Sequence, residues 1–272
     1  MKKKSDVLLL IPHYNNFEGL LRSLKSIKED QVIDVLIVDD GSIKDTIKED
    51  KLDINELSDL NLLFIYLDSN QGIEHALNKG IDYFKANEEY EFLARLDCGD
   101  LCGKNRFLIQ KELLISNPKL GIVGSNIKFV DLEGNFVYYL NLPEADKDIR
   151  KGMFKNAMFI HPSIMIKRII FNKVKYYPTT YPAAEDYAFF FEILKYFEGA
   201  NINQYLVTCE LNPDGISIKK RKVQLRSRLQ LIKENFYFGF YPIYGFTRNI
   251  LLYMLPFKFV ACLKRLRNNA NS

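Results

Sequence analysis

The chain has 272 residues, of which 47% are hydrophobic and 26% charged, with a formal net charge of +4. These proportions are those of an ordinary folded protein and exclude a disordered or collagen-like chain, and the length suits one large α/β domain with an appendage. The four cysteines are irregularly spaced, and the first apolar run, over 7–11, is too short for a secretory signal. We therefore expect a cytoplasmic protein in a reducing compartment.

Apolar runs and helical patterns alternate through the first third of the chain. The runs that predict strands cover residues 7–11, 35–38, 62–67 and 91–96. Continuous apolar runs of this kind are typical of parallel strands that are buried on both faces of a sheet. Helices are predicted around Leu20 and Leu24, which lie at helical spacing between the first two strands, and over 76–84. This alternation predicts a doubly wound, mostly parallel sheet.

The next stretch predicts one more strand, a hairpin and a helix. The strand covers 122–125, and the hairpin pairs 127–130 with 136–140 around the turn Glu133-Gly134-Asn135. Farther along, Glu185-Asp186 follows a loop and opens an aromatic helix over 187–196. The α/β domain is therefore expected to take up about two thirds of the chain or more.

Polar clusters follow the four predicted parallel strands at the points where these strands end. They cover residues 12–16, 39–42, 68–72 and 97–100. Ligands of doubly wound sheets bind at the carboxyl ends of the strands, so these clusters predict a nucleotide-type site. Asp97 and Asp100 supply carboxylate oxygens, which Mg²⁺ and Mn²⁺ prefer. An acidic turn with local Asx hydrogen bonds is the alternative for this last cluster.

The order of these segments resembles that of the inverting family 2 glycosyltransferases, which have a GT-A type fold. The matching segments are Ile11-Pro12-His13-Tyr14-Asn15, Val38-Asp39-Asp40-Gly41-Ser42, Asn70-Gln71-Gly72 with Ala76, Asn78 and Gly80, Arg95-Leu96-Asp97 with Asp100, Arg106 with Gln110, Gly124-Ser125, His161-Pro162-Ser163 and Glu185-Asp186-Tyr187. Each segment is a weak motif alone, but the ordered set spans about residues 5–217. The resemblance implies a GT-A glycosyltransferase domain over 1–217 and a basic helical tail over 218–272.

The resemblance also implies a site for the nucleotide-sugar donor. The residues implied to bind the donor are Pro12, Tyr14, Asp39, Asp40, Asn70, Gly72, Arg95 and Asp97. Pro12 and Tyr14 would form the wall on which a pyrimidine rests. A carboxylate of Asp39 or Asp40 would accept the imide N–H of uracil or thymine, and the backbone of 70–72 would approach the nucleotide closely at its glycine. For the two acids, a strand-to-helix turn with an N-cap is the alternative.

The acidic loop departs from the family pattern, which places acids at its first and third positions. Here the first is Asp97, the third is Gly99 and the fourth is Asp100. We expect Asp97 and Asp100 to hold Mg²⁺ or Mn²⁺ in a loop that Gly99 allows to shift. Weak metal binding and loss of activity are the alternatives. Arg95 would either pair with a diphosphate oxygen or lock this loop, and we favour locking slightly.

Asp186 is the general base that the resemblance implies. It would take a proton from an acceptor hydroxyl as that oxygen attacks the anomeric carbon opposite the diphosphate. Glu185 and His161 match positions near the acceptor side. For the two acids the alternative is stabilisation of a helix N-terminus through its dipole. A lone histidine beside apolar residues can equally be a hydrogen-bonded group of the core.

The tail differs in charge from the rest of the chain, because residues 219–272 contain twelve Lys or Arg and one Glu. Its apolar run, over 250–263, is shorter than the roughly 20 residues that span a bilayer. Basic flanks beside aromatic and aliphatic residues predict a helix pair in the interface of an anionic membrane. The alternative is a helical lid packed on the catalytic domain. No nucleic-acid-binding module frames the segment, so we expect no nucleic acid partner.

Together these features predict a hexosyltransferase-type enzyme with a nucleotide-diphosphate donor, a UDP-sugar being favoured over a dTDP-sugar. The acceptor would be a hydroxyl of a growing cell-surface glycan or lipid-linked saccharide, in polysaccharide or lipopolysaccharide biosynthesis. The enzyme would be peripheral at the inner face of the cell membrane. A catalytically silent nucleotide-sugar-binding or scaffold subunit is the alternative, motivated by Gly99 and the basic tail.

Overall fold

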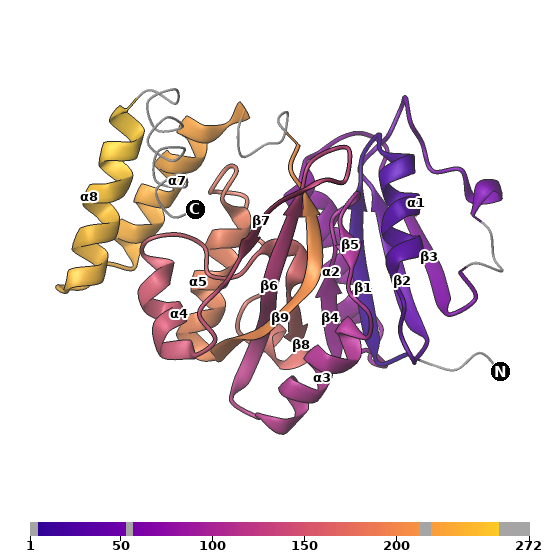
Figure 1. The fold of residues 1–272 in the computed structure, drawn as a ribbon, viewed down its shortest axis with the longest axis horizontal. Coiled ribbons are helices and arrows are strands. Elements are labelled where there is room, and N and C mark those ends of the chain that lie inside the picture. Colours follow the sequence, from indigo (N-terminus) through magenta and orange to yellow (C-terminus); the bar gives the residue numbers. More distant parts are fainter. Residues whose placement is uncertain (1–4, 53–56, 213–218, 256–272) are drawn as a thin grey trace.

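The computed structural model describes residues 5–52, 57–212 and 219–255, which form a mixed sheet with helices on both faces (Figure 1). The strands are β1 (Val7–His13), β2 (Ile33–Asp39), β3 (Leu60–Tyr66), β4 (Phe92–Arg95), β5 (Leu101–Cys102), β6 (Leu120–Val130), β7 (Phe136–Leu140), β8 (Met165–Lys167) and β9 (Glu198–Glu210). Their order is β3-β2-β1-β4-β8-β6-β9-β5, and β7 pairs with β6. The first four strands are mutually parallel, which confirms the doubly wound, mostly parallel sheet.

Helices cover both faces of this sheet. Alternate residues of its central strands point in opposite directions and are apolar, so both faces carry apolar side chains that the helices bury. The helices are α1 (Phe17–Ser26), α2 (Ile73–Ala86), α3 (Arg106–Ser116), α4 (Asp146–Met153), α5 (Glu185–Tyr196), α7 (Arg221–Glu234) and α8 (Phe240–Met254), with short 3₁₀ helices η1 (Glu49–Lys51), η2 (His161–Ser163) and η3 (Arg168–Asn172). Val7 and Leu9 belong to one apolar cluster with α1 and α3. Leu8 and Leu10 belong to a second with α2, α4 and α5. Burial on both faces explains the continuous apolar runs.

The prediction of a separate strand over 122–125 before the hairpin was wrong, because β6 is one continuous strand from Leu120 to Val130. Asn126, which interrupts the apolar pattern, is buried inside this strand instead of lying in a turn. Its side chain bonds Asn203 and the backbone N–H of Leu142, each at 2.8 Å. The hairpin itself is confirmed, since β7 pairs antiparallel with the second half of β6 beyond a turn in which Gly134 has φ +84°.

The two C-terminal helices α7 and α8 pack side by side at one end of the molecule (Figure 1). Leu231 and Ile232 of α7 belong to the apolar cluster that contains α5, and Ser227 donates a hydrogen bond to the carbonyl of Pro182 at 3.0 Å. α8 takes in only the first part of the predicted apolar run, and residues 256–263 lie outside the described residues. In the part of the chain that the structure describes, every helix is too short or too polar to cross a membrane.

Candidate functional site

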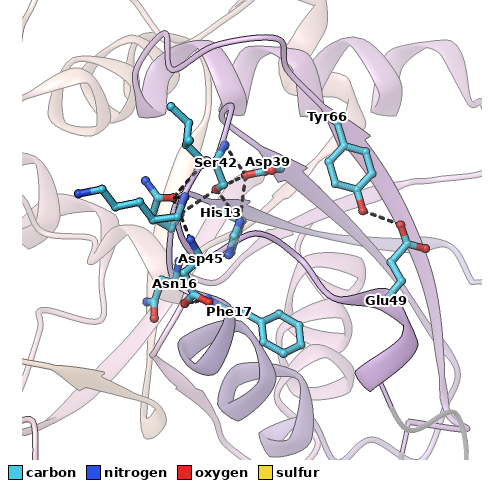
Figure 2. Close-up of polar contacts among 11 residues, drawn as sticks. His13, Asn16, Phe17, Asp39, Ser42, Asp45, Glu49 and Tyr66 are labelled. Atoms are coloured by element: carbon cyan, nitrogen blue, oxygen red, sulfur yellow. Dashed lines mark hydrogen bonds and ion pairs between the residues drawn. The ribbon is translucent and has the colours of Figure 1, made fainter.

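The carboxyl ends of β1 and β2 bring His13 and Asp39 together, because the parallel register pairs these two residues (Figure 2). Both side chains are buried. His13 Nδ1 lies 3.0 Å from Asp39 Oδ1, and Ser42 Oγ donates to the same oxygen at 2.5 Å. Asp39 Oδ2 makes no hydrogen bond within the described residues. One carboxylate oxygen of Asp39 is therefore held by the protein, and the other is available to a ligand.

A pocket of about 340 Å³ lies beside Asp39. Its lining includes Ser42, Ile43, Tyr66 and Asn70. Tyr66 is half exposed, and its hydroxyl donates to Glu49 at 2.5 Å (Figure 2). Pro12 and Tyr14, which were predicted to form the wall for the nucleobase, do not line this pocket. The side chain of Tyr14 is exposed to solvent. Their contact with a nucleobase stays a prediction.

The neighbouring acid, Asp40, uses both of its carboxylate oxygens in hydrogen bonds within the protein. Its two oxygens accept hydrogen bonds from the backbone N–H groups of Gln71 at 2.8 Å and Gly72 at 2.9 Å. Burial raises the pKa of Asp40, and these two bonds oppose the rise. Gly72 has φ +103°, a conformation that glycine adopts without strain. Asp40 therefore holds the loop that follows β3, and Asp39 is the acid that borders the pocket.

Gly41 is required by a close backbone approach between the two loops. Its φ is +67°, and a Cβ built on it would lie 2.4 Å from the carbonyl carbon of Ser69. Such a distance is far below van der Waals contact, so a larger residue would force the loops after β2 and β3 apart.

Arg95 lies beneath the acidic loop with 1% of its surface exposed. Its guanidinium ion-pairs with Asp97 and donates to the carbonyl of Leu96 at 2.8 Å. It also approaches both ring nitrogens of His161 at 3.3 Å, and Tyr177 Oη lies 2.9 Å from His161 Nε2. Burial and the Arg95 charge lower the pKa of His161 well below its ordinary range, so this ring is neutral. The arrangement fits the locking role for Arg95.

The acidic loop presents one accessible and one buried carboxylate. The side chain of Asp97 is 37% exposed. Asp100 is 7% exposed, and its Oδ1 accepts from the backbone N–H of Glu210 at 3.0 Å. Burial, followed by the charge of Asp97, raises the pKa of Asp100 to about 7. Gly99 between them has φ +102°, so the glycine supplies a turn that an aspartate at the same position would strain.

The acidic loop supplies two carboxylates, a type of ligand that Mg²⁺ and Mn²⁺ prefer. No group of three or more ligating His, Cys, Asp or Glu side chains occurs within the described ranges. Mg²⁺ and Mn²⁺ sites at phosphates nevertheless use one or two protein carboxylates, with the substrate and water as the other ligands. The repulsion that raises the pKa of Asp100 is an interaction that such a cation would relieve.

The N-terminus of α5 carries the second pair of acids, Glu185 and Asp186. Asp186 Oδ1 accepts from the backbone N–H of Tyr187 at 2.7 Å. Burial raises the pKa of Asp186, Asp97 adds to the rise, and Arg228 of α7 opposes it. Burial and Asp186 raise the pKa of Glu185 to about 7. Asp97, from the exit of β4, is therefore close enough to the start of α5 for its charge to raise the pKa of Asp186 and Glu185.

Three features of this region were not found from the sequence. His13 belongs to a segment that was singled out, but its partner Asp39 becomes visible only through strand pairing. Tyr177 lies in a loop and binds His161. Arg228 was counted only as a charge of the tail, although α7 carries it toward Asp186. The apolar spacing of Leu225, Leu231 and Ile232 was a signal that α7 packs on the domain.

Known proteins resemble the chain in sequence. It is 28% identical over 222 residues to the bifunctional glycosyltransferase pgtA of Dictyostelium discoideum, covering 70% of this chain and 28% of that protein. It is 30% identical over 137 residues to the O-antigen biosynthesis glycosyltransferase WbnJ of Escherichia coli, covering 50% of this chain and 52% of that protein. The chain thus spans only part of the length of either relative.

Solved structures resemble the fold. TarS residues 1–349 of S. aureus, in complex with UDP, superimposes with a TM-score of 0.56 at 20% identity, covering 83% of this chain and 65% of that one. The mannosyltransferase PcManGT of Pyrobaculum calidifontis, in complex with GDP-Man and Mn²⁺, gives 0.62 at 14% identity, covering all of this chain and 82% of that one. The GT-A type fold is thereby confirmed. A family model for glycosyl transferase family 2 matches residues 9–175, more than half of the chain, and the chain therefore belongs to this family.

Proposed function

We propose that the protein is an inverting glycosyltransferase that moves a sugar from a UDP-sugar, or a dTDP-sugar, to a hydroxyl of a growing cell-surface glycan or lipid-linked saccharide. The observation that carries the proposal is the proximity of Asp186 and Asp97. Asp97 follows β4, one of the parallel strands, and contributes to the raised pKa of Asp186 at the start of α5. A direct displacement requires a base close to the leaving-group site.

The pocket beside Asp39 supports a pyrimidine donor. Asp39 Oδ2 can only accept a hydrogen bond, and the imide N–H of uracil or thymine is a donor. Asn70 and Gly72, on the loop held by Asp40, would lie against the nucleotide. The neighbour TarS is solved with UDP and PcManGT with GDP-Man, so the fold by itself does not select the base.

Asp186 would act as the general base. Its carboxylate would take the proton of the acceptor hydroxyl while that oxygen attacks the anomeric carbon from the face opposite the diphosphate, which inverts the configuration. Arg228 favours the ionised form that this role needs. Glu185 and His161 would lie on the acceptor side, with His161 fixed by Arg95 and Tyr177. A positioned general base contributes about 10²- to 10⁴-fold.

Asp97 and Asp100 would hold Mg²⁺ or Mn²⁺, as the Mn²⁺ in the PcManGT complex suggests for this fold. When bound, such an ion stabilises the negative charge that develops on the leaving diphosphate. Arg95 would keep Asp97 in place for it through their ion pair.

An exposed aromatic surface at and before α8 supports a peripheral location at the inner face of the cell membrane and a lipid-linked acceptor. Phe238 is 96% exposed and Phe240 73% exposed. Lys151 of α4 lies 5.7 Å from the ring centre of Tyr241, so basic and aromatic side chains adjoin there. Exposed aromatic residues with adjacent lysines favour the interface of an anionic bilayer. Removal of residues after 235, which leaves α7 in place, should move the protein from vesicles to solution in a flotation assay.

The test of the catalytic proposal is transfer and hydrolysis of UDP-, dTDP- and GDP-sugars with and without Mn²⁺. Asp186→Asn should lower turnover about 10²- to 10⁴-fold while leaving the donor Kd nearly unchanged. Glu192→Gln is the matched control, because Glu192 lies on the same helix and pairs with Lys195. Unaltered turnover in Asp186→Asn would overturn the assignment of the base. Donor binding without any turnover by the wild type would instead support the silent binding subunit.

A further inference from the structure

Hydrogen bonds join Asp39, beside the nucleobase pocket, to Asn16 through His13 (Figure 2). From Asn16 a further bond reaches the acidic loop. His13, which is 1% exposed, contacts Asp39 Oδ1 with its Nδ1 and accepts the backbone N–H of Asn16 with its Nε2, at 3.0 and 3.3 Å. Asn16 Nδ2 in turn donates to the carbonyl of Cys98 at 3.4 Å. Cys98 follows Asp97 directly, so these bonds join two loops that are far apart in sequence.

The partners of His13 determine where its proton lies. The Asp39 carboxylate can only accept and the Asn16 backbone N–H can only donate, so both bonds require a neutral ring with the proton on Nδ1. A proton on Nε2 would place two N–H groups against each other at Asn16. Ser42 Oγ reinforces the geometry, since it donates to Asp39 Oδ1 and accepts from the backbone N–H of Asn15 at 2.8 Å.

Asn16 is itself fixed at the start of α1. It is the N-cap of this helix, and its Oδ1 accepts from the backbone N–H of Gly19 at 3.1 Å. Its side-chain amide therefore has its oxygen on α1 and its nitrogen on the acidic loop. Asn16 thus contacts His13 through its backbone N–H and contacts Cys98 through its side-chain amide, so one residue at the start of α1 makes both contacts.

We infer that His13 is a positioning residue for the donor. It orients Asp39 so that Oδ2 remains available to the nucleobase, and through Asn16 it sets the position of the loop that carries Asp97. Base recognition and metal-loop geometry would then depend on one imidazole in one tautomer. The inference rests on the proposed function for its consequence on donor binding, whereas the coupling between the two loops can be measured without a ligand.

Two substitutions separate the two bonds of His13. His13→Asn places an amide near the position of Nδ1 and keeps a hydrogen-bond donor to Asp39. His13→Gln places an amide near the position of Nε2 and keeps an acceptor for the backbone N–H of Asn16. His13→Gln should weaken UDP binding about tenfold, since it loses a hydrogen bond to a charged group, with and without Mn²⁺. His13→Asn should bind UDP like the wild type without metal but lose most of the gain from Mn²⁺. Each variant is the control for the other, because both replace the same buried ring.

Calorimetric titration with UDP, with and without Mn²⁺, measures these effects, and hydrogen–deuterium exchange of residues 97–100 measures the coupling in the ligand-free protein. Exchange should rise in His13→Asn and stay near wild type in His13→Gln. Equal exchange in all three proteins would overturn the inference. So would an unchanged UDP affinity in both variants together with a lowered Tm, because His13 would then be only a stabilising residue of the core. Failure of the wild type to bind any nucleotide would count against the proposed function, while the exchange result would still decide the coupling.

Discussion

Replacing Asp100 by Asn should stabilise the metal-free protein at pH 8. Burial and the charge of Asp97 raise the pKa of Asp100 from 3.8 to about 7, so the folded state binds more protons than the unfolded state between these values. The free energy of unfolding therefore falls as the pH rises through this range, and the loss is complete above about pH 7. The pKa rises by about three, and a rise of one corresponds to about 1.36 kcal/mol, so the gain in the free energy of unfolding of Asp100→Asn is at most about 4 kcal/mol. Asn cannot ionise and keeps an oxygen for the N–H of Glu210.

Urea unfolding in EDTA at a series of pH values measures the difference between Asp100→Asn and the wild type. The variant's advantage should be small near pH 4, grow as the pH rises to about 7, and then stay constant. Mn²⁺ at pH 8 should stabilise the wild type but not the variant, if Asp100 is a ligand. Asp131→Asn is the control of opposite sign, because hydrogen bonds from Asn135 lower the pKa of Asp131. A difference that does not change with pH, or a less stable Asp100→Asn at pH 8, would refute the reasoning.

Two further changes test the site from other directions. Arg228→Met should shift the acidic limb of the turnover–pH profile to higher pH, because Arg228 opposes the rise in the pKa of Asp186; a profile identical to that of the wild type would contradict this. Gly41→Ala should destabilise the protein by about 1–3 kcal/mol from backbone strain alone, and the clash with Ser69 should add a further loss. Gly134 has φ +84° and open space around it, so Gly134→Ala should show the loss from strain alone. Chemical denaturation compares the two, and equal losses would mean that the loops can separate without a penalty.

The parts of the fold that could be predicted from the sequence are those that local pattern alone determines. β1 and β2 are rich in consecutive apolar residues because both of their faces are buried, so their positions were visible. β9 was missed because Asn203, Gln204 and Tyr205 are exposed in its middle, and its strand conformation depends on pairing with β6 over almost its whole length. Tertiary pairing overrides weak local propensity in such a strand.

The loops that form the site were predictable from the sequence, but the different partners of neighbouring residues within a loop were not. Asp39 and Asp40 are adjacent in sequence and chemically identical, yet successive residues of an extended chain point to opposite sides. One borders the pocket and the other bonds the backbone after β3. Only the spatial arrangement of the loops distinguishes them. The charge effects of Asp97 and Arg228 on Asp186 likewise depend on how the elements are arranged in space.

The position of α7 has a practical consequence for dissecting the protein. A cut at residue 217 would take away Leu231 and Ile232, which fill part of the core beside α5, together with the guanidinium that faces the start of that helix. Loss of activity after such a cut would reveal nothing about lipid attachment. Chimeras and truncations that aim to separate anchoring from turnover should therefore be joined after Glu234, where α7 ends and the aromatic segment begins.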